Sequence, residues 1–205
     1  MKILIKISAL FILFSTIACN QIADDILSPE NGSSLDEATI FSTPGLAKGA
    51  IDGILIPIGE TNSYRGRWIP WYGMNTDTEW YNSSESTSND NADLCVYDAK
   101  TNNSQMNTAN NVWAMMYQGI ERANIAIRGL RKYGNPTPGS ELGYYLGEAL
   151  TYRAVYYADL LKTWGDVPAR FEPITNETEK KKKTNRDIIY KQIIADLGEA
   201  EELVP

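Results

Sequence analysis

Residues 148–168 read EALTYRAVYYADLLKTWGDVP, and this stretch decides the fold class. Its apolar residues continue a helical spacing that starts at Leu142 and closes at Trp164, just before Gly165. The pattern predicts a long amphipathic helix with one buried face. Arg153 falls on the apolar stripe, where a structural arginine paired with an acid is expected more often than a catalytic one.

A second helical pattern lies directly upstream, from about Asn110 to Leu130. Its apolar residues recur at i, i+3, i+4 and i+7 and stop before the turn-forming Gly134-Asn135-Pro136. Because only a short turn joins the two patterns, they are expected to form an antiparallel helix pair.

Further helices are predicted on both sides of this pair. Asp36 and Glu37 open a short first turn, and Thr43-Pro44 places a capping hydroxyl before a proline at the first helical position. That helix carries Leu46, Ala50, Ile51, Ile54 and Leu55 and ends at Pro57 to Gly59. The last helix is capped by Thr184 or Asn185 and carries Ile189, Ile193, Leu197, Ala200 and Val204 on one face. We therefore expect a mainly α fold of tetratricopeptide-like helix pairs, with repeats of about 34 residues.

Helical periodicity disappears between Glu60 and Asn107, where Trp, Tyr, Gly, Asn and Ser dominate. A long irregular insertion inside a compact domain is more often functional than idle. The aromatic residues gather near its start, namely Trp68, Trp71, Tyr72, Trp80 and Tyr81.

The N-terminus has the parts of a secretory signal: Lys2, an apolar stretch from Ile7 to Ile17, and the small residue Ala18 before Cys19. The run Thr16-Ile17-Ala18-Cys19 fits cleavage directly before a cysteine that receives a diacylglycerol. The alternative is an ordinary signal with a cysteine nearby by chance. We expect residues 1–18 to be the signal peptide, 19–34 a lipidated flexible tether, and 35–205 the helical domain. Membrane attachment would then be through the lipid on Cys19 alone.

Three stretches resemble the N-terminal half of the SusD/RagB family of outer-membrane nutrient-binding lipoproteins. They are residues 148–168, residues 111–127 and residues 189–205, and the first is the most specific. The resemblance implies helical repeats and a lid-like position over a TonB-dependent, SusC-like transporter on the outer face of the outer membrane. It also implies oligosaccharide or, in some members, peptide binding without catalysis. Family members run well beyond 205 residues, so a C-terminal half is expected to be missing here.

The insertion supplies the side chains that a glycan needs. Flat rings cover the C–H faces of sugars, while amides, guanidinium groups and carboxylates bond the hydroxyl rim. At least half of the rings are expected to anchor the insertion against the helices instead. Asp77 resembles an acidic position of the family, and Trp80 and Tyr81 are the best ring candidates. The predicted ligand-binding residues are Trp80, Tyr81, Asp77, Asn75, Arg67 and Trp71.

Composition argues against several other functions. The chain has no histidine, which excludes a histidine base or metal ligand, and we expect no catalysis, no cofactor and no metal site. Its formal charge is −7; loss of residues 1–18 removes Lys2 and Lys6 and leaves 17 basic against 26 acidic residues, a net −9. Such a charge disfavours nucleic acid and suits a neutral ligand better than an anionic one. A peptide-capturing or purely scaffolding lipoprotein of the same transport complex is the alternative function.

Overall fold

The computed structural model describes residues 35–69, 76–79, 90, 93, 103–104, 110–175 and 180–205. Residues 37–205 belong to one compact unit, and Leu35 and Asp36 do not belong to it. The signal peptide and the tether therefore lie outside the described residues, as does Cys19.

The compact unit is built from helices, as predicted. In chain order they are α2 (Glu37–Ser42), α3 (Pro44–Gly59), the π-helical turn η1 (Tyr64–Trp68), α7 (Val112–Gly129), the π-helical turn η2 (Leu130–Gly134), α8 (Glu141–Trp164) and α9 (Arg186–Leu203). The described residues contain no strand beyond an isolated antiparallel bridge between Val167 and Thr184.

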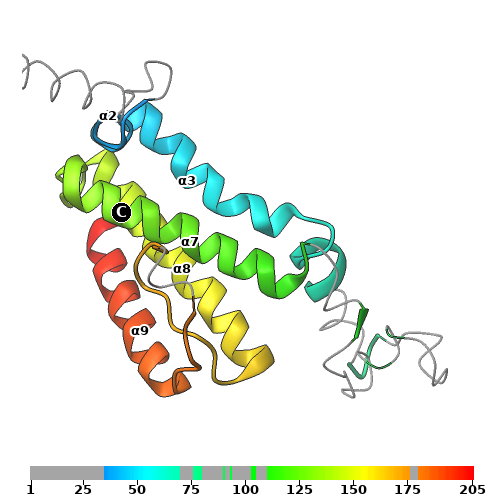
Figure 1. The fold of residues 1–205 in the computed structure, drawn as a ribbon. Coiled ribbons are helices and arrows are strands. Elements are labelled where there is room, and N and C mark those ends of the chain that lie inside the picture. Colours follow the sequence, from blue (N-terminus) through cyan, green and yellow to red (C-terminus); the bar gives the residue numbers. More distant parts are fainter. Residues whose placement is uncertain are drawn as a thin grey trace, which may run out of the picture. The chain divides into compact units, whose positions relative to one another are not determined.

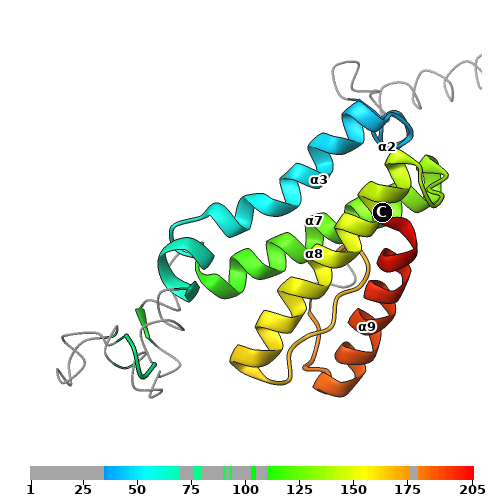
Figure 2. The same cartoon turned by 180° about the vertical axis from the view of Figure 1, so that it is seen from behind.

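The helices pack as antiparallel neighbours (Figures 1 and 2). α7 and α8 form the predicted hairpin, α3 packs on both of them, and α9 packs along α8. The loop between α8 and α9 runs back over the helices before α9 begins. Successive helices thus alternate in direction, which is the predicted tetratricopeptide-like arrangement.

Helix ends follow local capping rules. The side chains of Asn111, Ser140 and Asn185 each accept a hydrogen bond from a backbone N–H in the first turn of α7, α8 and α9. Asn185, and not Thr184, is therefore the cap of α9. Gly165 closes α8 at φ 70°, a conformation that side chains with a Cβ rarely adopt.

The core lies where α3, α7, α8 and α9 meet, and most predicted stripes are buried. Its largest fully buried side chains include Ile51 and Ile54 from α3, Met116 and Ile120 from α7, Leu150, Tyr156, Tyr157 and Leu160 from α8, and Ile189 from α9. Burial of this apolar surface is the main favourable term for the fold, at roughly 25 cal/mol per Å².

Four details differ from the sequence-based expectation. Thr43 precedes α3 and Pro44 opens it, but the Thr43 hydroxyl makes no capping bond, and Pro57 lies inside the helix, which ends two residues later. Leu46 and Leu55 are 37% exposed, and Leu197 is 43% exposed. Ile189, Ile193 and Leu197 of α9 are four residues apart, and each step of four residues turns the side chain by about 40° around the helix axis. Leu197 is therefore rotated away from the face of α9 that packs on α8.

The fourth difference concerns the insertion. The expected irregular segment begins with the π-helical turn η1. Trp68 is the last residue of η1, and Ile69 is the last described residue before position 76.

Candidate functional site

The structure describes two of the six predicted ligand-binding residues. Arg67 lies in η1, and Asp77 is exposed in the short described stretch 76–79. Neither donates to or accepts from the other in the described part of the chain. Trp71, Asn75, Trp80 and Tyr81 lie outside the described residues, so their role stays a prediction.

The turn η1 is fixed to α8 by two hydrogen bonds at matching spacing. The Tyr64 hydroxyl donates to Asp159 Oδ2 at 2.7 Å, and Trp68 Nε1 donates to Thr163 Oγ1 at 3.1 Å. Both pairs of residues are four apart, so one face of η1 meets one face of α8. The point from which the insertion leaves the helices is thereby set.

The Tyr64–Asp159 bond is buried. Tyr64 is 5% and Asp159 is 6% exposed, and Lys162 Nζ supplies a second donor to Asp159 at 3.1 Å. Burial, followed by the charge of Asp159, raises the pKa of the Tyr64 hydroxyl well above its ordinary value. The hydroxyl therefore stays a donor throughout the physiological range.

Arg67 keeps unused bonding capacity beside this anchor. Its Nη2 donates to Asn62 Oδ1 at a long 3.4 Å, while its Nε and the Ser63 hydroxyl are buried without a hydrogen-bond partner in the described structure. Unsatisfied buried polar groups are uncommon in native proteins and call for a reason. Arg67 as a whole is only half-buried, so its guanidinium at the start of the insertion can still donate to ligand hydroxyls.

Three half-buried rings gather at this end of the α7–α8 hairpin, and we call Trp113, Tyr117 and Trp164 the aromatic cluster. The Trp113 and Trp164 rings meet edge to face at 86° with their centroids 5.2 Å apart, and Trp113 and Tyr117 lie 5.0 Å apart. The Tyr117 hydroxyl donates to the Pro168 carbonyl at 2.7 Å. Offset and edge-to-face rings of this kind are rigid, so the cluster is a preorganised surface.

The indole N–H groups of the cluster donate to no group among the residues that the structure describes. Whereas Trp68 Nε1 donates to Thr163, the described structure gives Trp113 and Trp164 no hydrogen bond from their indole nitrogens. Neither of these N–H groups is buried and unsatisfied, so water or a ligand can reach them. A flat apolar ring with an available N–H donor matches a sugar, which has C–H faces and hydroxyl edges.

Sequence reasoning placed Trp113 and Trp164 in helices but did not bring them together as a site. One signal could have found them, because Trp113 is the second residue of α7 and Trp164 the last of α8. In an antiparallel hairpin the beginning of the first helix lies beside the end of the second.

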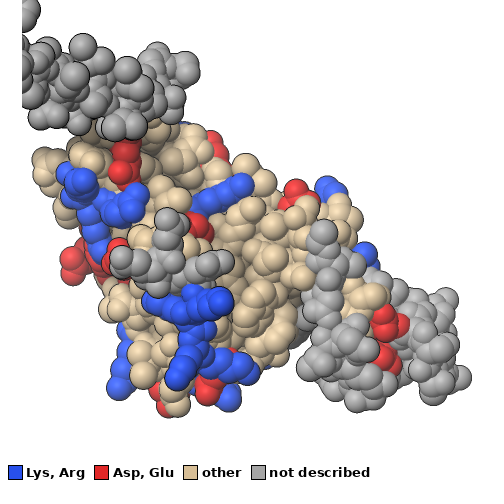
Figure 3. Space-filling model, in the orientation of Figure 1, with Lys and Arg blue, Asp and Glu red and all other residues tan. Residues whose placement is uncertain are grey.

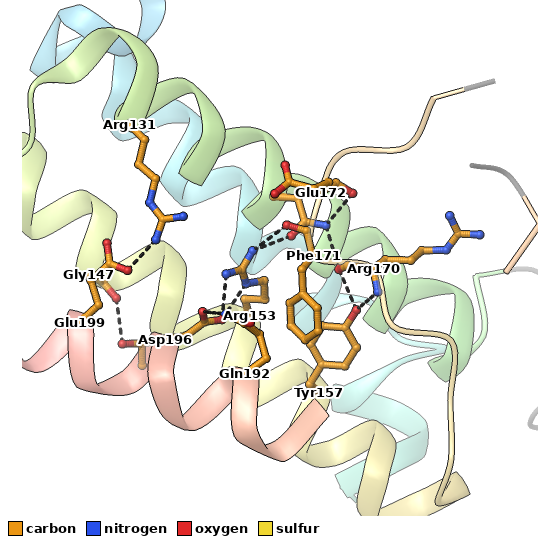
Figure 4. A network of polar contacts seen from close by, with 12 residues as sticks. Arg131, Gly147, Arg153, Tyr157, Arg170, Phe171, Glu172, Gln192, Asp196 and Glu199 are labelled. Carbon is orange, nitrogen blue, oxygen red and sulfur yellow. Dashed lines mark hydrogen bonds and ion pairs between the residues drawn. The ribbon is translucent and has the colours of Figure 1, made fainter. Parts of the chain in front are cut away.

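Arg153 has the structural role expected of it (Figure 4). Its guanidinium donates to Asp196 Oδ2 at 2.9 Å, to Asn124 Oδ1 at 3.0 Å and to the Phe171 carbonyl at 3.1 Å. Arg153 and Asp196 are each 2% exposed. The guanidinium thus joins α7, α8, α9 and the loop after α8 by hydrogen bonds.

The loop after α8 is held by the same network. Asn124 Nδ2 donates to the carbonyls of Arg170 and Glu172, and the Tyr157 hydroxyl both donates to the Arg170 carbonyl and accepts from its N–H. These bonds satisfy backbone groups that the irregular loop cannot pair with itself.

In the part of the chain that the structure describes, no helix is long and apolar enough to cross a membrane.

Comparison with known proteins shows similarity to SusD-like proteins over most of the chain. A SusD-like family model, described as starch-binding and associating with the outer membrane, matches residues 50–205. The SusD-like protein P38 of Formosa agariphila is 26% identical over 208 residues, an alignment that covers 98% of this chain and 38% of that protein.

Solved structures share the fold. A SusD superfamily protein from Bacteroides vulgatus is 20% identical with a TM-score of 0.66, over 82% of this chain and 36% of that one. A SusD-like protein from Bacteroides fragilis is 17% identical with a TM-score of 0.66, over 87% of this chain and 32% of that one. The chain therefore spans less than two fifths of the length of the relatives that it matches.

Proposed function

The chain belongs to the SusD-like family, and from this premise we propose that it binds oligosaccharides at the cell surface and delivers them to a TonB-dependent outer-membrane transporter. The family description supports starch-type glycan binding and association with the outer membrane. The transporter partner, the surface position and the lipid on Cys19 are parts of the proposal.

The observation that carries the proposal is the aromatic cluster at the end of the helices where the insertion begins. Trp113 of α7 and Trp164 of α8 meet edge to face, and Trp68 of η1 donates to Thr163, the neighbour of Trp164. The insertion between η1 and α7 adds the predicted Trp71, Asn75, Asp77, Trp80 and Tyr81. We propose that both contribute to one glycan-binding surface, with Arg67 bonding the hydroxyl rim.

The proposed protein binds glycan without cleaving it. Glycosidases need two carboxyl groups about 5–9.5 Å apart around the scissile bond. Asp159 and Asp196 are the buried acids of the described structure, and each is engaged by a structural partner. Neither is available as a catalytic acid or base.

Titration calorimetry of the purified protein with a panel of neutral oligosaccharides tests the proposal. Trp80→Ala should weaken binding by about 1–3 kcal/mol because it removes a stacking ring. Trp113→Phe keeps a ring in the cluster but removes the indole N–H, so it should weaken binding by about 1 kcal/mol. Tyr144→Ala is the matched control, because Tyr144 is 40% exposed near the other end of α8.

The outcomes separate the possible functions. Binding that both tryptophan variants weaken and Tyr144→Ala leaves unchanged supports a glycan surface at this end. Binding that no variant changes keeps the function and rejects the site. If neither a neutral nor a charged oligosaccharide binds, glycan binding is rejected, and peptide capture or scaffolding becomes the function to test.

The membrane anchor has its own test. Cys19→Ser should abolish incorporation of labelled fatty acid and move the protein out of the membrane fraction, because the lipid is the proposed attachment. Cys95→Ser is the matched control, since the chain has only two cysteines. A Cys19→Ser protein that stays in the membrane fraction would contradict lipid-only anchoring.

A further inference from the structure

A concave site lies away from the aromatic cluster, on the C-terminal half of α7. It is a cavity of about 270 Å³ lined by Asn124, Ile127, Arg128, Arg131, Lys132, Phe171 and Glu172. Five of these residues form one stripe along α7 and η2, and the other two belong to the loop after α8. We call it the basic pocket.

The pocket is positively charged although the chain is acidic. Arg128, Arg131 and Lys132 face a single lining acid, Glu172, so the lining residues sum to +2. Figure 3, in the orientation of Figure 1, shows Lys and Arg atoms at the C-terminal end of α7, with Asp and Glu atoms beside them. The lining is therefore basic although the whole chain carries a net charge of −7, and the two acids that pair with its arginines lie outside the lining.

The cations of the pocket have donors to spare. Arg128 donates to Glu37 Oε1 and Arg131 to Glu199, but each guanidinium has five N–H donors. These ion pairs are solvent-exposed, with side-chain exposures of 45% and 35% in the first and 47% and 40% in the second. Exposed pairs contribute only about 0–1 kcal/mol, so a ligand can share or replace them.

The floor of the pocket is rigid and already satisfied. Asn124 uses both ends of its amide, toward Arg153 and toward two loop carbonyls. Phe171 lies 4.8 Å from the Tyr157 ring and under the Arg153 guanidinium at 5.2 Å. With its faces engaged, Phe171 adds an apolar wall and no stacking platform, so the selectivity of the pocket comes from its charges.

We propose that the basic pocket binds an anionic sugar unit of the glycan, one that carries a carboxylate or a sulfate group. This inference rests on the proposed glycan function. The volume lies just below the range of about 300–1,000 Å³ typical of ligand pockets, which suits one ring-sized unit. The anionic group bonds the guanidinium donors of Arg128 and Arg131 and the ammonium of Lys132, and Glu172 accepts from sugar hydroxyls.

The test compares one neutral tetrasaccharide with two charged tetrasaccharides. Calorimetric titration with tetragalacturonate, a sulfated tetrasaccharide and maltotetraose should give the tighter binding for a charged ligand. Raising the salt from about 50 mM to about 500 mM should weaken that binding, because it screens exposed charges. Arg131→Gln and Lys132→Gln should each lower the affinity for the charged ligand about tenfold and leave any maltotetraose affinity unchanged.

Arg186→Gln is the matched control, since Arg186 is an exposed arginine in an ion pair with Asp166 outside the pocket; its side chain is 57% exposed, against 47% for Arg131. Its affinity for every ligand should equal that of the unaltered protein. If maltotetraose binds as well as the charged ligands, or if the two pocket variants bind charged ligands normally, the inference is overturned and glycan binding stands. If no oligosaccharide binds, both fail; binding of a poly-glutamate peptide alone would assign the pocket to a protein partner and also overturn the inference.

Discussion

At the scale of single residues, the buried Arg153–Asp196 pair shows how the polar interior is organised. A lysine could not replace Arg153, because its ammonium is a single point charge. The planar guanidinium reaches Asp196, Asn124 and the Phe171 carbonyl from one position. Three helices and a loop thus share one cation. The pair specifies the path of the loop after α8 more than it adds stability.

Removing one partner of this pair should therefore be costly. Asp196→Ala leaves Arg153 buried without a counter-charge, so the free energy of unfolding measured in urea should fall by about 3–5 kcal/mol. Asp52→Ala, which breaks the exposed Lys48–Asp52 pair on α3, is the control and should change it by less than about 0.5 kcal/mol. A small effect of Asp196→Ala would mean that the guanidinium finds water or another acceptor.

At the scale of elements, glycines decide how closely α7 and α8 approach. A Cβ on Gly119 of α7 would lie 2.3 Å from the Tyr156 ring of α8, which is fully buried and donates its hydroxyl to the Ile54 carbonyl of α3. Gly49 of α3, by contrast, has no neighbour within 4 Å of such a Cβ. Two glycines in helices therefore have opposite roles.

Alanine at the two positions should change stability in opposite directions. Gly119→Ala forces Tyr156 to move and should lower the free energy of unfolding by about 1–3 kcal/mol. Gly49→Ala only restricts the unfolded chain and should raise it by about 0.5–1 kcal/mol. Urea denaturation of both variants checks this; equal effects would contradict the close approach at Gly119.

At the scale of the whole molecule, buried tyrosines link the elements and make stability depend on pH. Burial raises the pKa of Tyr64, Tyr156 and Tyr157 above the ordinary value, and the charge of Asp159 adds to the effect at Tyr64. Their hydroxyls donate to Asp159, to Ile54 of α3 and to the loop at Arg170. Ionisation of any of them in the folded protein would break a tertiary contact.

The sign of the pH effect follows from these raised pKa values. Below about pH 10 folded and unfolded tyrosines are both protonated, and above it the unfolded chain loses protons first. The free energy of unfolding should then fall with rising pH, by up to about 1.4 kcal/mol per pH unit for each buried tyrosine. Urea denaturation between about pH 8 and about pH 11 measures the slope, and Tyr157→Phe should reduce it. A stability that does not change above pH 10 would contradict the burial of these hydroxyls.

The helices, their order and the family could be read from the amino-acid sequence alone. Apolar periodicity and capping residues act within a few neighbours along the chain, so α7, α8 and α9 and the cap at Asn185 or its neighbour could be predicted. Three stretches, of which Glu148 to Pro168 is the most specific, carried the SusD-like resemblance, which the family model confirms over residues 50–205.

Which side chains contact one another, by contrast, follows from the packing of the helices. Trp113 and Trp164 are 51 positions apart, and Arg131 and Phe171 are 40 apart, yet each pair contributes to one surface. The exposure of Leu197 and the π-helical turn that holds Trp68 against Thr163 depend likewise on which neighbour packs where. Local pattern fixes the face of a helix to within a few tens of degrees, whereas a binding surface depends on contacts between distant elements, and these form only when the helices pack.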